Sequence, residues 1–256
     1  MPMSGPRDGD GFDDDPRREG AGWHEPAHLG EGASDREEPA PSSWEPPGWS
    51  LPPVQPDRPA GWDLLAEDPF GLRTEAVARG WTLTDGTAPD NAVLGNLLAA
   101  GPVRLGKEHR PAGVVRGRWG NLELVAFDVV HPLGRRLVYQ YAVTAAPLLG
   151  AVPPLRLSPA RLWKHRTGGL LQVPSGDADF DARWTMLAAE DGPQVRRLVE
   201  DPAVRGLLMG SDDGDEFWTA AGFLAVVRPD AHRPLLLEHH ARLLTAAVAA
   251  LAAGAF

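Results

Sequence analysis

The chain contains no cysteine among its 256 residues. This absence excludes disulfide bonds, a thiolate nucleophile and zinc sites with cysteine ligands. Isoleucine is also absent, and lysine occurs only twice, at Lys107 and Lys164, beside 23 arginines. Such usage is typical of a GC-rich genome, so the abundance of arginine does not by itself indicate a basic binding surface.

A surplus of basic charge is missing as well. The formal net charge is −10 at pH 7, and residues 1–60 hold 13 acidic against 5 basic residues. The remaining residues 61–256 hold 22 acidic and 20 basic residues. Because phosphate contacts are made by lysine and arginine, we expect no nucleic-acid partner.

Long apolar segments are also missing. Residues 1–20 lack the apolar core of a secretory signal. The longest uncharged apolar stretch, Leu243–Phe256, has 14 residues, fewer than the roughly 20 that a membrane-spanning helix needs. We therefore expect a cytoplasmic protein with no membrane partner.

The N-terminal residues differ in composition from the rest, since 12 of the 26 prolines fall within residues 1–60. The apolar residues of this segment are too few for their burial to offset the entropy cost of ordering the chain. We predict a disordered acidic tail over residues 1–60 and a single folded domain over residues 61–256.

The tail nevertheless contains the segment WEPPGW. Its residues Trp44, Pro46, Pro47 and Trp49 are typical of a short polyproline II motif that presents indole rings to a protein partner. The alternative is that these residues have no role.

Strand patterns dominate the predicted domain. The run Val114–Val130 predicts a hairpin with a type II′ turn at Gly120-Asn121, pairing Trp119 with Leu122 and Arg118 with Glu123. A third strand is predicted over residues 136–144, which completes a meander. Further strands are predicted over residues 155–157, 170–173 and 180–187, and a second hairpin over residues 216–220 and 223–228.

Helices are predicted over residues 69–79, 89–100, 159–165, 192–199, 202–209 and 233–252. Asp68, Ser158 and Asp201 each precede a proline, which is the pattern of a helix N-cap. Strands in runs, with helices between and after them, predict an α+β fold with a mainly antiparallel sheet. The long C-terminal amphipathic helix is expected to pack on this sheet, with a dimer contact through its Ala-rich end as the alternative. No cofactor is expected, because a domain of this size buries enough surface to fold alone.

Recognisable chemistry is sparse. The acidic run Ser211–Glu216 lacks the ligand spacing of a calcium loop, so we interpret it as an exposed helix-to-strand loop. His239 and His240 are adjacent on a predicted helix and point about 100° apart, so we expect no shared metal. No metal site is predicted.

One cluster brings together an acid, an imidazole and two phenols. Asp128 and His131 lie at the end of one predicted strand, and Tyr139 and Tyr141 share a face of the next. These four residues form a candidate pocket. The alternative is a strand-end turn with tyrosines that pack against the sheet.

The order of four segments carries a resemblance. Residues 78–81 (ARGW), 114–130, 153–163 (PPLRLSPARLW) and 177–199 together are similar to a group of actinobacterial proteins of unknown function. The resemblance covers about residues 70–253. It implies structural roles for Gly120, Phe127 and Phe180, and for Arg183 an ion pair with Asp181 or a contact at a helix end. It implies no catalytic residues.

These observations favour a non-catalytic interaction or regulatory module that binds a protein partner through the tail or the C-terminal helix. One alternative is a small-molecule-binding domain with a cavity between the meander and the helices. The other is a hydrolase in which Asp128 and His131 act as base and orienting residue.

Overall fold

The computed structural model describes residues 68–134, 136–160 and 168–253. All of these residues belong to one compact unit. The predicted tail, including Trp44, Pro46, Pro47 and Trp49, lies outside the described residues.

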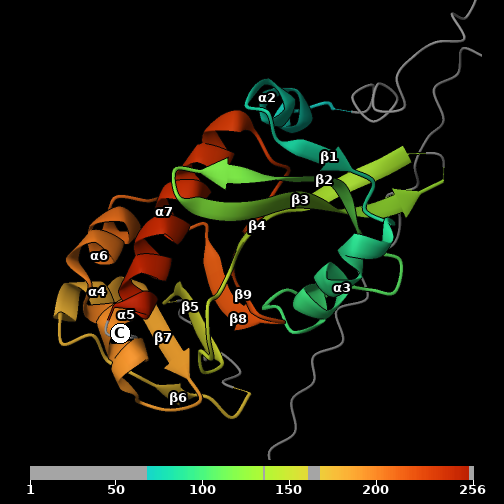
Figure 1. The fold of residues 1–256 in the computed structure, drawn as a ribbon. Coiled ribbons are helices and arrows are strands. Elements are labelled where there is room, and N and C mark those ends of the chain that lie inside the picture. Colours follow the sequence, from blue (N-terminus) through green and yellow to red (C-terminus); the bar gives the residue numbers. More distant parts are fainter. Residues whose placement is uncertain (1–67, 135, 161–167, 254–256) are drawn as a thin grey trace, which may run out of the picture. The chain divides into compact units, whose positions relative to one another are not determined.

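One antiparallel sheet of nine strands organises the described residues (Figure 1). Its spatial order is β1-β2-β3-β4-β9-β8-β5-β7-β6, and every pairing is antiparallel. The predicted α+β class with an antiparallel sheet is therefore confirmed. The strands are β1 Thr82–Thr84, β2 Arg110–Trp119, β3 Leu122–Leu133, β4 Arg136–Pro147, β5 Leu155–Pro159, β6 Leu171–Gln172, β7 Trp184–Ala188, β8 Glu216–Ala220 and β9 Phe223–Pro229.

Two tight hairpins set the register of the sheet. In the first, Trp119 pairs with Leu122 and Arg118 with Glu123, as predicted. Gly120 has a φ of 59°, the left-handed value that the first turn residue of a type II′ turn requires. The second hairpin joins β8 to β9 through Ala221 and Gly222, with φ values of 51° and 79°. Two positive φ values are typical of a type I′ turn.

The helices are short apart from the last one. Asp201 accepts hydrogen bonds from the backbone N–H groups of Ala203 and Val204, which confirms the predicted N-cap. The helices are α2 Leu72–Ala78, the 3₁₀ helix η1 Pro89–Asn91, α3 Ala92–Ala99, α4 Ala178–Arg183, α5 Pro193–Glu200, α6 Pro202–Met209 and α7 Pro234–Ala252.

Helix α2 begins at Leu72 with Gly71 at its N-cap, so the N-cap predicted at Asp68 is wrong. Two further segments differ from the sequence-based expectation. The strand predicted over residues 180–187 is helix α4 followed by β7, because the side chain of Asp177 caps the backbone N–H groups of Asp179 and Phe180. The helix predicted from Ser158 does not begin there, because Ser158 pairs with Thr185 inside the sheet. The rest of that predicted helix, residues 161–165, lies outside the described residues.

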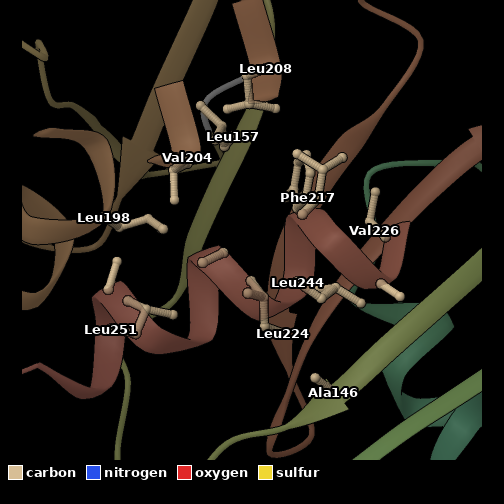
Figure 2. Close-up of a cluster of buried hydrophobic side chains, with 14 of the residues drawn as sticks. Ala146, Leu157, Leu198, Val204, Leu208, Phe217, Leu224, Val226, Leu244 and Leu251 are labelled. Carbon is tan, nitrogen blue, oxygen red and sulfur yellow. The ribbon is translucent and has the colours of Figure 1, made fainter. Parts of the chain in front are cut away.

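Helices cover both faces of the sheet. Helix α7 lies along one face together with α5 and α6, as Figure 1 shows. Figure 2 shows Leu244 and Leu251 of α7 among side chains from α5, α6, β8 and β9. Helix α3 covers part of the other face, where Leu94 and Leu97 pack with Phe127. The predicted packing of the C-terminal helix on the sheet is therefore confirmed.

Helix α7 is long and apolar enough to cross a membrane by length and composition alone, with 19 residues and a mean hydropathy of 1.3. The apolar side chains of this helix that are buried face the core, and a core helix passes the same test. Between α7, α5, α6 and the sheet there is an apolar cavity of about 10 Å³, lined in part by Leu157, Phe217 and Ala247.

Two glycines test the packing in opposite directions. A Cβ added to Gly117 would lie 2.1 Å from the indole ring of Trp81, whereas one added to Gly95 of α3 meets no atom within 4 Å. We expect Gly117→Ala to lower the free energy of unfolding by about 1–3 kcal/mol, because the buried Trp81 must move. Gly95→Ala should raise it by about 1 kcal/mol through helix propensity. Urea unfolding of both variants measures this, and a loss of stability in both would contradict it.

The type I′ turn gives a second prediction. Ala221 holds a left-handed φ of 51° that alanine adopts at a cost and asparagine tolerates. Ala221→Asn should therefore raise the free energy of unfolding by about 0.5–1 kcal/mol, measured in the same assay. Ala221→Val is the matched control, and it should be destabilising because a β-branched residue disfavours positive φ.

Candidate functional site

A buried carboxylate joins the start of β8 to α7 and β9. Asp215 directly precedes β8 and is 0% exposed. Its Oδ1 lies 2.8 Å from Nε of Arg228 and 3.1 Å from Nε2 of His240. Its Oδ2 lies 3.0 Å from Nη2 of Arg228 and 2.8 Å from Nε2 of His239. Both oxygens of this carboxylate therefore have two partners.

These partners keep Asp215 ionised. Burial alone raises the pKa of the carboxyl group, but hydrogen bonds from His239, His240 and Arg228 outweigh it and hold the pKa well below its usual range. Arg228 also donates to both oxygens of Asp212, so its guanidinium group bridges two carboxylates. Because it is ionised, Asp215 accepts the hydrogen bond in each of its contacts with His239, His240 and Arg228.

A line of polar side chains continues from Asp215 into the sheet. Nδ1 of His240 lies 3.0 Å from Oγ1 of Thr144, which lies 2.9 Å from Nε2 of His232. Nδ1 of His232 lies 3.1 Å from Oδ1 of Asp128. The same Asp128 oxygen accepts the backbone N–H of His232 at 2.8 Å. We call these five residues, Asp128, His232, Thr144, His240 and Asp215, the buried polar chain.

The residues of the buried polar chain meet because each occupies a position that faces the protein interior. His240 lies three residues after Leu237 and four before Leu244, on the apolar face of the helix. Asp128 and Thr144 lie on the face of β3 and β4 toward α7. Burial lowers the pKa of His240 to about 4, even though Asp215 raises it, so this imidazole is neutral at pH 7.

A pocket of about 570 Å³ adjoins the Asp215 end of the buried polar chain. It is formed by the loop between α6 and β8, the end of β9 and the first turns of α7. His239, whose side chain is 30% exposed, lines the pocket and binds Asp215 behind it. The other lining residues are Gly210, Ser211, Asp212, Arg228, Pro229, Asp230, Ala231, Arg233, Leu235 and Leu236.

Charges of both signs line the pocket in pairs. Arg228 binds Asp212, and Arg233 lies 3.1 Å from Asp230 and over the ring of Phe70. Asp230 has a φ of 92°, which is rare for a residue other than glycine. Strained backbone of this kind persists where the surrounding structure holds it, and it is often found at functional sites. Leu235, 80% exposed, is an apolar residue at the same pocket.

The four residues of the sequence-predicted pocket have different surroundings. Asp128 belongs to the buried polar chain, whereas the ring of His131 stacks on that of His109 at 5.2 Å. Tyr139 contacts Phe70 edge to face, and Tyr141 packs with the core beneath α3. The four side chains therefore do not form one group.

A β-bulge explains why the two tyrosines part. Tyr141 pairs with Val129, but Tyr139 pairs with Val130, so β4 contains one extra residue, Gln140. An extra residue reverses the alternation of side chains, and Tyr139 and Tyr141 lie on opposite faces. The expectation that they share a face is wrong for this reason.

The acidic run 211–216 also differs from the expectation of an exposed loop. Asp213 binds Arg183, which also donates to the carbonyl oxygens of Met209 and Ser211 at the end of α6. The predicted contact of Arg183 at a helix end is thus confirmed. Asp215 is buried because Arg228 and the two histidines offset its charge, and these partners are distant in sequence. The sequence does contain one indication of a buried polar site, because His240 is a polar residue on the apolar face of its helix.

The arrangement offers binding groups more readily than a reactive centre. Ser211, which lines the pocket, donates its hydroxyl hydrogen to the carbonyl of Leu208. Among the residues that the structure describes, no cluster of three or more metal-ligating side chains has the geometry to hold a metal ion. Nε2 of His239 binds Asp215, and the other ring nitrogen, Nδ1, can form a hydrogen bond with a group bound in the pocket.

No family model and no curated protein matches the chain. A solved structure has a similar fold, the crystal structure of the mycobacterial trehalose monomycolate transport factor A, TtfA. The two share 14% sequence identity with a TM-score of 0.51, and the match covers 70% of this chain and 92% of TtfA. This likeness shows the fold alone.

The buried His240 gives a pH prediction. Because its folded pKa of about 4 lies below the ordinary value of 6.5, the unfolded state binds a proton first as the pH falls. This contribution to stability is complete above pH 6.5 and is lost as the pH falls toward 4, by at most about 1.4 kcal/mol per pH unit.

Urea unfolding between pH 7 and 4 measures this slope. His240→Gln, which does not titrate, should show a shallower slope than the unsubstituted protein, whatever its absolute stability. His109→Gln is the matched control and should keep the slope. Equal slopes for the His240→Gln variant and the unsubstituted protein would refute the prediction.

Proposed function

We propose that this protein is a non-catalytic interaction module and that the pocket at the start of α7 binds a partner protein. The observation that carries the proposal is Leu235, an 80% exposed leucine at the pocket, beside ion-paired arginines and acids. An apolar anchor beside polar groups is the usual composition of a protein interface.

The pairing of the charges supports a protein ligand over a free anion. Arg228 and Arg233 are each bound to aspartates, so a small anion would have to compete with carboxylates already in place. A protein surface with its own mixed charges can match such a rim while placing an apolar side chain against Leu235 and Leu236.

Two further observations fit a binding role. The hydroxyl of Ser211 and the side chain of His239 are engaged with Leu208 and Asp215, so the pocket holds no activated nucleophile among these residues. The apolar cavity beneath α7, about 10 Å³, is much smaller than the roughly 300 Å³ or more of ordinary ligand sites. A lipid chain does not fit there.

The likeness to TtfA is compatible with this proposal, since a transport factor is a role that binding can serve. The tail residues Trp44, Pro46, Pro47 and Trp49 are proposed as a second contact segment for a protein partner, on the basis of the sequence alone.

A photo-crosslinking residue at position 235 of the full chain tests the proposal in the cells from which the protein comes. We expect a covalent adduct of one defined mass at position 235. The same residue at position 149 is the control, because Leu149 is 98% exposed and does not line this pocket. The substitution Arg233→Glu should reduce the adduct at position 235 at least tenfold.

Equal labelling at positions 235 and 149 would contradict the proposal. An adduct at position 235 that persists unchanged in the Arg233→Glu variant would also contradict it, because the charged rim would then take no part in binding. Circular dichroism of each variant confirms that the fold is kept.

A further inference from the structure

The buried polar chain consists of four consecutive contacts, each of hydrogen-bond length. They join Asp128 to His232, His232 to Thr144, Thr144 to His240, and His240 to Asp215, at 3.1, 2.9, 3.0 and 3.1 Å. All five side chains are almost fully buried. Water is therefore not at hand to replace a missing hydrogen bond, and an unmade contact is costly.

The groups of the buried polar chain, in their usual protonation states, carry one hydrogen atom fewer than its four contacts need. Each of the four contacts needs one hydrogen atom between its two heavy atoms. A neutral imidazole carries one N–H, so His232, His240 and the hydroxyl of Thr144 supply three hydrogen atoms. Ionised carboxylates at both ends, Asp128 and Asp215, supply none. Four satisfied contacts therefore require one additional proton.

The surroundings locate this proton. His240 donates Nε2–H to Asp215, which is ionised, and accepts the hydroxyl hydrogen of Thr144 at Nδ1. The pKa of His240 of about 4 agrees with a neutral ring. Thr144 can then accept a hydrogen bond only from Nε2–H of His232. The proton that remains lies between His232 and Asp128.

We propose that the buried polar chain is a proton-dependent lock that holds the start of α7 on the sheet and so sets the shape of the adjoining pocket. His232 carries both ring protons, bound to Asp128 of β3 and Thr144 of β4. His240 holds the next turn of the helix to Thr144 and Asp215. This inference concerns regulation of the pocket and rests on the proposed function.

The position of the pocket makes the lock relevant to binding. The pocket residues Ala231, Arg233, Leu235, Leu236 and His239 lie beside or between the two histidines in sequence. The histidines hold the inner side of this segment, and the pocket residues line its outer side. A change in the inner contacts therefore moves the binding residues.

The lock weakens when the proton count changes in either direction. Loss of the additional proton brings two lone pairs together in one of the four contacts. Gain of a further proton by His240 turns its Nδ1 from an acceptor into a donor, so the hydroxyl hydrogen of Thr144 loses its acceptor. The charged and titratable groups that contact the two histidines are Asp128 on β3, Asp215 before β8 and His239 on α7. Arg228 on β9 binds Asp215 from the other side, and Asp212 binds Arg228.

Nitrogen NMR of the full chain with ¹⁵N-labelled histidine tests the proton count. At pH 7 we expect three ring N–H protons on His232 and His240 together, two of them on His232. Replacement of the other histidines by glutamine, one at a time, assigns the signals. Two singly protonated rings in the unsubstituted protein would overturn the proposal, whether or not any variant folds.

Substitution of Thr144 separates the count from simple packing. Thr144→Val removes the hydroxyl and leaves two contacts, which two neutral rings satisfy, so His232 should lose its second proton. Thr144→Ser keeps all four contacts and should keep that proton. A doubly protonated His232 in a folded Thr144→Val variant would overturn the proposal.

The crosslink at position 235 completes the test. If the lock regulates the pocket, adduct formation in Thr144→Val should fall at least tenfold and remain in Thr144→Ser. An unchanged adduct in Thr144→Val overturns the regulatory link, whereas an absent adduct in the unsubstituted protein is a failure of the proposed function and leaves the NMR result to decide the proton count.

Discussion

The arrangement of α7 on the sheet depends on the carboxylate of Asp215. This one buried group accepts hydrogen bonds from two adjacent histidines of the helix and from Arg228 of β9. A buried charge is tolerated only when opposite charge and donors surround it. Asp215 therefore fixes the rotation of α7 as well as its position, since both His239 and His240 must face it.

Apolar packing alone would leave the position and rotation of α7 on the sheet less well defined. Leu244 and Leu251 pack among leucine, valine and phenylalanine side chains, which tolerate small shifts of one helix along another. Hydrogen bonds from His240 to Thr144 and Asp215 have directions that such shifts would break. The same contacts place His239, Leu235 and Leu236 at the pocket, so the element that stabilises the core also forms the candidate binding surface.

Local patterns were sufficient for most of the framework. The Gly120-Asn121 turn, the alternation of β2 and β3 and the cap of Asp201 depend on neighbours within a few residues, and all were predictable. Prediction failed where a side chain has a choice of partners. Asp177 caps a short helix in a segment that reads as a strand, and the bulge at Gln140 turns Tyr139 and Tyr141 to opposite faces.

The sequence by itself determined the antiparallel α+β class, the hairpin registers and the amphipathic C-terminal helix, because turn geometry and hydrophobic periodicity are local properties. Only the tertiary structure decided the site. Asp128, Thr144, Asp215, His232 and His240 come from segments up to 112 residues apart, and each on its own is an ordinary polar residue. Their chemistry arises from burial and mutual distance, which exist only once β3, β4, β8 and α7 have packed together.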